Sequence, residues 1–156
     1  MKIFSRILIV LGVAVVVMQF IGRPEKTNPP EDPSVTLANQ VAVPAAVRDI
    51  LERSCADCHS NRTRWPWYSS VAPVSWLVAR DVEEGREHLN FSAWGTYSRK
   101  QQASRLLDIS REVDKGEMPM SIYVLMHGNA RLSTVDKDTL CAWAENLSDE
   151  LMGTSE

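Results

Sequence analysis

The stretch that decides the fold is Arg53-Ser-Cys-Ala-Asp-Cys-His-Ser-Asn-Arg62. It holds two of the chain's three cysteines, Cys55 and Cys58, and one of its three histidines, His59. In a C-x-x-C-H sequence the two thiols add to the two vinyl groups of one porphyrin, and the histidine is carried beneath the iron as a ligand. The stretch therefore predicts one covalent haem c, attached through Cys55 and Cys58, with His59 as an iron ligand.

Two other chemistries use a pair of cysteines at this spacing. A redox-active dithiol usually accompanies a βαβ pattern, and the sequence shows none. A zinc site needs further ligands, for which Cys141, His88 and His127 are candidates, but no second paired motif is present. We therefore favour haem, with zinc and the dithiol as alternatives.

The opposite side of the iron needs a second ligand or stays open. The segment Gly116-Glu-Met-Pro-Met-Ser121 is a loop between two predicted helices, stiffened by its proline. Met118 is the preferred ligand, and Met120, His127, His88 and an open position are alternatives. A thioether ligand raises the reduction potential, which suits electron transfer.

The part of the chain that follows residue 44 has the pattern of short helices. Apolar residues recur at helical spacing, and no run alternates as a strand would. Two capping-box pairs mark helix starts, Ser98 with Gln101 and Ser133 with Asp136, and Gly116 is placed to end a helix. We predict an all-α, cytochrome c-like domain of about five short helices around the haem, over residues 44–150.

The first 43 residues predict two further segments. Residues 1–22 contain an apolar run of about 20 positions, enough for about 30 Å of helix, and are predicted to be an uncleaved transmembrane signal anchor. Lys2 and Arg6 precede the run, which places the following domain in the periplasm, at the inner membrane. A cleaved signal peptide is the alternative, but small residues are missing where cleavage needs them. Residues 23–43 are proline-rich and predict an extended linker.

The charge of the chain indicates which classes of partner to expect. The formal net charge is −3, and no block of basic residues is present. Nucleic-acid binding requires such a block to neutralise phosphates. We therefore expect no nucleic-acid partner.

Aromatic residues are frequent directly after the C-x-x-C-H sequence. Large flat side chains suit the surroundings of a porphyrin, so four of them are predicted to wall the haem pocket. They are Trp65, Trp67, Tyr68 and Trp76.

Two supporting roles are also predicted close to the motif. The second ring nitrogen of His59 should donate to a backbone carbonyl, for which those near Pro66 and Pro73 are candidates. Arg62 or Arg64 is a candidate partner for the haem propionates, although solvated surface arginines are an equal alternative.

Several motifs beyond C-x-x-C-H give the sequence a family resemblance. They are Asn61, Thr63-Arg-Trp-Pro-Trp-Tyr68, Pro73-Val-Ser-Trp76, Gly85-Arg-Glu-His-Leu-Asn-Phe91, Gly116-Glu-Met-Pro119, Tyr123, His127, Arg131-Leu132 and Trp143-Ala144. From about residue 43 to residue 143, the chain resembles the small bacterial haem-binding domain family related to cytochromes c. The resemblance implies a c-type haem domain facing the periplasm, with a helix before C-x-x-C-H and a C-terminal helix packing across it. It also supports Met118 over Met120 as ligand.

Together these features predict a membrane-anchored monohaem electron carrier that is not an enzyme. Its partners would be redox proteins in or at the inner membrane. A haem-based sensor with a displaceable methionine is the first alternative. A peroxidase-like enzyme is the second, because His88 lies near Arg86 in the sequence.

Overall fold

The computed structural model describes residues 2–153, and within them every regular element is helical. The α-helices are α1 (Lys2–Met18), α2 (Leu37–Gln40), α3 (Ala45–Ser54), α4 (Ala56–His59), α5 (Val74–His88), α6 (Arg99–Asp114), α7 (Ser121–Met126) and α8 (Thr134–Gly153). Four 3-10 helices join them: η1 (Pro33–Val35), η2 (Trp67–Ser70), η3 (Phe91–Thr96) and η4 (Gly128–Ala130). The all-α prediction is confirmed for the described residues, with more helices than the five expected.

The predicted transmembrane helix at the N-terminus is wrong. Among residues 2–153, no helix is both long enough and apolar enough to cross a membrane. Helix α1 ends at Met18 after 17 residues, or about 26 Å, which is short of the roughly 30 Å of a bilayer's hydrocarbon layer. The chain leaves the helix at Gln19, where the side-chain amide of that residue donates to the carbonyl of Ala72 (3.2 Å) and its oxygen accepts from the Ala72 N–H (3.0 Å).

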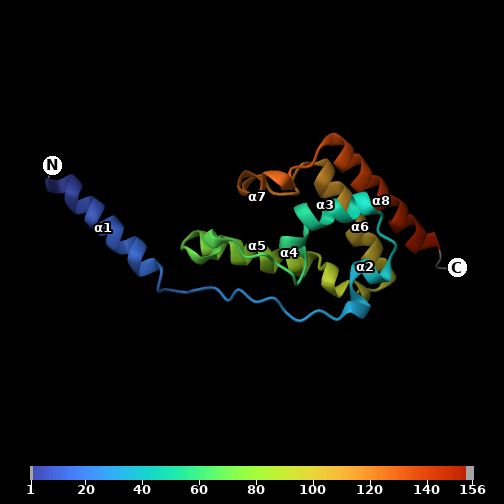
Figure 1. Ribbon diagram of the computed structural model, residues 1–156, viewed down its shortest axis with the longest axis horizontal. Helices are drawn as coiled ribbons and strands as arrows, with labels where there is room; N and C mark the ends of the chain where they lie inside the picture. The colour runs from blue at the N-terminus through green and yellow to red at the C-terminus, as the bar shows by residue number, and fades with distance from the viewer. Residues whose placement is uncertain (1, 154–156) are drawn as a thin grey trace.

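The segment between α1 and α3 is held against the domain. Figure 1 shows it running beside α5 before it reaches α2. The Nζ of Lys26 donates to Ser70 Oγ (2.6 Å), and the Nδ2 of Asn28 donates to the carbonyl of Thr63 (2.9 Å). Although its composition is that of an extended spacer, this segment is bonded along its length to the residues that follow C-x-x-C-H.

The core lies where α6 and α8 pack side by side, with α3 against α8 (Figure 1). Its largest fully buried side chains are those of Val47, Ile50, Trp94, Leu106 and Leu140. Packing against this core fixes the position of α3, and α3 ends directly before Cys55.

Both predicted helix starts are confirmed. Ser98 and Gln101 form a reciprocal capping box at the start of α6. The carboxylate of Asp136 accepts from the Ser133 backbone N–H (2.8 Å), and the Asp136 N–H donates to Ser133 Oγ (3.1 Å). Arg53 Nη2 lies 2.9 Å from the Asp136 carboxylate and so joins the last turn of α3 to the first turn of α8.

Candidate functional site

A cavity of about 510 Å³ lies between α3, α4, α5, α6 and the segment that enters α7. Its size falls in the range of about 300–1,000 Å³ that is usual for cofactor sites. Cys55, Cys58, His59, Met118 and Met120 all line it. Residues of α4, α5 and α7 all contribute to this lining, and Figure 1 shows α7 lying across from α4 and α5. The fold therefore brings residues 55–59 and 118–120 to one site.

His59 is oriented by two backbone carbonyls. Its Nδ1 lies 2.9 Å from the carbonyl oxygen of Gly85 and 3.1 Å from that of Leu89, so Nδ1 carries the proton. The carbonyls near Pro66 and Pro73, which the sequence suggested, are not used. Nε2 has no hydrogen-bond partner among residues 2–153, which leaves it free to bind a metal ion. Burial lowers the pKa of His59, and the neutral ring that results is the form that coordinates iron.

Gly85 explains how α5 comes close enough to hold His59. A Cβ atom at this position would lie 2.8 Å from the Cys58 carbonyl oxygen and 3.1 Å from the Cys58 Cβ. Only glycine fits there without moving α5 away from α4. A glycine in the middle of a helical pattern is the sequence signal for such a close contact.

Burial disfavours the charged form of both cysteine thiols. Burial raises the pKa of Cys55 to about 12 and that of Cys58 to about 11. Dithiol oxidoreductases use the opposite shift, a lowered thiol pKa. In the described part of the chain, no group of three or more His, Cys, Asp or Glu side chains is placed to hold a metal ion, so the zinc alternative lacks its donors.

The methionine loop, residues 116–120, starts from a fixed helix end. Gly116 has φ +76° and donates from its N–H to the Val113 carbonyl (3.1 Å), while the Glu117 N–H donates to the Glu112 carbonyl (3.0 Å). These two bonds form a Schellman motif, which requires a residue with positive φ. The Met118 N–H donates to the same Glu112 carbonyl (3.1 Å). Met118 lines the cavity and is 36% exposed.

The four predicted aromatic residues lie elsewhere. None of Trp65, Trp67, Tyr68 and Trp76 lines the cavity. Trp67 is 77% exposed, and the Nε1 of Trp76 donates to the Gly22 carbonyl (2.9 Å). The aromatic side chains that do line the cavity are Phe91, whose ring centroid lies 6.2 Å from that of His59, and Tyr123.

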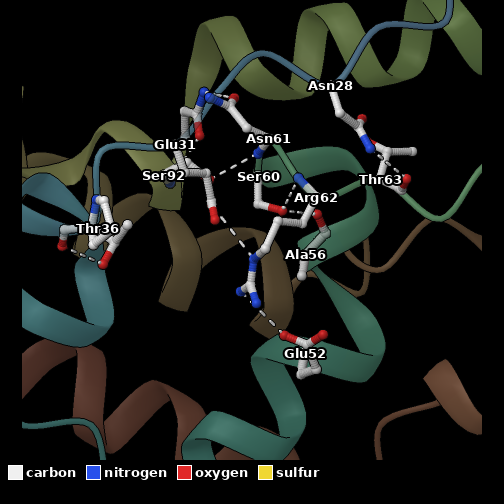
Figure 2. A network of polar contacts seen from close by, with 12 residues as sticks. Asn28, Glu31, Thr36, Glu52, Ala56, Ser60, Asn61, Arg62, Thr63 and Ser92 are labelled. Atoms are coloured by element: carbon white, nitrogen blue, oxygen red, sulfur yellow. Dashed lines mark hydrogen bonds and ion pairs between the residues drawn. The ribbon is translucent and has the colours of Figure 1, made fainter.

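Arg62, which follows the C-x-x-C-H sequence, forms ion pairs within the protein. Figure 2 shows Arg62 between the carboxylates of Glu31 (3.5 Å) and Glu52 (3.4 Å), where it links the N-terminal segment to α3. Nearby, Ser92 bonds to Glu31 and accepts from the N–H of Asn61 (2.8 Å). These bonds hold Arg62 away from the cavity.

Arg64 and Arg86 also lie outside the cavity lining. Arg64 Nε lies 3.0 Å from the carboxylate of Asp57. Arg86 donates to acceptors on Ser60, Thr27, Asn28 and Thr63. A peroxidase-like pair of His88 and Arg86 over the cavity is therefore not formed.

Arg105 and Arg111 on α6 are the arginines that line the cavity. Arg111 is paired with the carboxylates of Asp108 (2.7 Å) and Glu112 (3.2 Å). Within residues 2–153, Arg105 has no carboxylate partner, and its guanidinium lies over the ring of Tyr97 at 5.6 Å. Arg105 is thus the better placed of the two to pair with an acidic group of a bound cofactor.

The lining fits a haem. The cavity has the volume of a cofactor site, the unpartnered Nε2 of His59 lies at one wall, and two methionines lie in the segment along its other side. In agreement, the family model described as haem-binding domain matches residues 13–146. The chain therefore belongs to the haem-binding domain family, as its motifs suggested, and haem is its cofactor. No curated protein and no solved structure matches the chain.

Proposed function

We propose that the protein is a monohaem c-type electron carrier, with the haem attached through Cys55 and Cys58 and the iron held by His59 and Met118. The observation that carries this proposal is the lining of one cavity by both cysteines, the histidine and the methionine loop. The bound haem supplies a one-electron couple between ferrous and ferric iron.

The chain's own residues have three tasks in this proposal. The carbonyls of Gly85 and Leu89 keep the proton of His59 on Nδ1, which leaves Nε2 as the nitrogen that would hold the iron. Met118 would be the second protein ligand of the iron, and iron with two protein ligands would be suited to electron transfer rather than catalysis. Arg105, which lines the cavity, would pair with a haem propionate.

The proposal extends to the compartment and the partners. In bacteria, thioether attachment at C-x-x-C-H takes place outside the cytoplasm, so we place the haem domain in the periplasm. Its partners would be redox proteins that approach the cavity near the exposed Met118.

Visible spectroscopy tests this function. We expect the oxidised protein to show the weak far-red band of sulfur-ligated ferric haem, and the reduced spectrum to change little when carbon monoxide is added. Prompt binding of carbon monoxide by the reduced wild-type protein would contradict the carrier and support the sensor with a displaceable methionine. Turnover of peroxide with an electron donor would support an enzyme.

A further inference from the structure

Helix α7 follows the methionine loop without a break but has little packing of its own. None of its residues is buried, and the side chains of Ile122, Leu125 and Met126 are more than half exposed. The loop's first end is fixed by the Glu112 carbonyl at the end of α6. The position of the loop's second end, at residue 120, depends on the contacts that hold α7 to the rest of the domain.

One side-chain bond joins α7 directly to the haem-attachment motif. The hydroxyl of Tyr123 donates to Oδ2 of Asp57 at 2.8 Å. Asp57 lies between Cys55 and Cys58 in the sequence and is 8% exposed. The bond therefore connects the helix beyond the methionine loop with the turn that carries both cysteines.

The Asp57 end of this bond is firmly held. The Oδ1 of Asp57 accepts from the backbone N–H (3.1 Å) and the Nε (3.0 Å) of Arg64. The backbone carbonyl of Asp57 accepts from Thr63 Oγ1 at 2.7 Å, and this hydrogen bond is buried. A hydrogen bond to such a fixed carboxylate is among the stronger ones in a protein.

The Tyr123 end is also well defined. The ring stacks on that of His127, with the centroids 4.1 Å apart and the planes 25° from parallel. The Nε2 of His127 lies 3.3 Å from the hydroxyl of Tyr68 on η2. Burial, together with the hydrogen bond to Asp57, raises the pKa of Tyr123, so the phenol keeps the proton that it donates.

We propose that Tyr123 is a positioning residue for Met118, and that its bond to Asp57 is the latch that holds residues 118–120 in the lining of the cavity. This inference rests on the proposed function, because it presumes that Met118 is the ligand. Tyr123 acts through the loop: when its bond is lost, one end of the loop is released and Met118 leaves its position more often. Ligation strength is thereby set by a residue five positions from the ligand.

The test is Tyr123→Phe, which removes one oxygen atom and keeps the ring. Tyr97→Phe is the matched control, because the Tyr97 hydroxyl accepts from the Asn90 N–H (3.0 Å) and does not line the cavity. We expect carbon monoxide to bind reduced Tyr123→Phe about tenfold faster than wild type, the effect of losing one hydrogen bond to a charged group. The far-red band of the oxidised variant should disappear at a lower temperature. Tyr97→Phe should match wild type in both measurements.

The outcomes separate the latch from the proposed function. If wild type shows the far-red band and Tyr123→Phe has the same carbon monoxide rate and the same thermal loss of the band, the latch is contradicted while the ligation stands. If wild type lacks the band or binds carbon monoxide promptly, the proposed ligation fails and the latch fails with it. Asp57→Asn, which weakens the acceptor of the same bond, should shift both readouts in the same direction as Tyr123→Phe.

Discussion

The two sides of the cavity are built differently. On the side of α4 and α5, His59 is held by two carbonyls, and Gly85 brings the two helices into contact at Cys58. On the other side, α7 has no buried residue, Met118 is 36% exposed, and the methionine loop is held by backbone bonds at one end and by Tyr123 at the other.

This difference assigns different tasks to the two sides. The first side is part of the packed fold, so it fixes the direction of His59 and would fix the proposed attachment of the haem. The second side has no buried residue in α7, so the proposed ligand Met118 would be the adjustable one. Changes on the first side should therefore affect whether haem is held, and changes on the second how the iron is ligated.

The largest expected effect is that of removing the attachment thiols. In the double variant Cys55→Ala/Cys58→Ala, no thioether bond forms, so all pigment should leave the polypeptide in acidified acetone. Cys141→Ala is the control and should retain its haem, because Cys141 packs against the core away from the cavity. If the double variant and wild type retain equal amounts of pigment, the haem is not attached through Cys55 and Cys58.

Changing the methionine loop should alter the spectrum while the haem stays attached. Met118→Ala should lose the far-red band, bind carbon monoxide in the reduced state and have a lower reduction potential, because the thioether that favours ferrous iron is gone. Met120→Ala is the matched control from the same loop and should keep the band. If the effects of the two variants are exchanged, Met120 is the ligand. If neither variant loses the band, the iron is not ligated by this loop.

Adding a methyl group between α4 and α5 should lower stability. Gly85→Ala places a Cβ 2.8 Å from the Cys58 carbonyl oxygen, and overpacking of this kind costs about 2 kcal/mol. Gly128→Ala is the control, since a Cβ there meets no atom within 4 Å. The free energy of unfolding in urea measures both. If the two variants are equally stable, α5 can move away from α4 at little cost, which would contradict the tight contact assigned to Gly85.

The smallest effect is expected at the start of α8, away from both sides of the cavity. Hydrogen bonds from Ser133 and the pairing with Arg53 lower the pKa of Asp136, so its contribution to stability is present above its unfolded pKa and is lost as the pH falls through its folded pKa. Asp136→Asn should cost about 1 kcal/mol at pH 7 and progressively less below about pH 4.

Asp138→Asn, an exposed change on the same helix, is the control for this effect. Urea unfolding at several pH values checks it. A cost for Asp136→Asn that does not change between pH 7 and pH 3 would contradict the assigned role of the carboxylate.

The local signals of the sequence predicted most of the helical architecture. The capping boxes and the glycine that ends α6 depend on residues three to five positions apart, and they are found where expected. The N-terminal prediction failed because the apolar run is longer than the helix it forms. The run continues to Ile21, but α1 ends at Met18 and the side chain of Gln19 bonds to Ala72.

The site was predictable in its motif and not in its surroundings. Spacing alone places Cys55, Cys58 and His59 together, since they share one turn. The carbonyls that orient His59 come from 26 and 30 residues away, and the Tyr123 hydroxyl reaches Asp57 from 66 residues away. Partners at such separations depend on how α5 and α7 pack, which no local pattern encodes. The same reason explains why nearby tryptophans were expected in the pocket and Phe91 and Tyr123 are found there.

The central claim is that one haem is bonded to Cys55 and Cys58, with His59 beneath its iron. Its most direct test is the intact mass of the wild-type polypeptide, produced together with a c-type haem attachment system and denatured before measurement. We predict a single species whose mass is that of the polypeptide plus one haem. A denatured polypeptide with the bare mass, although the native protein was coloured, would contradict covalent attachment.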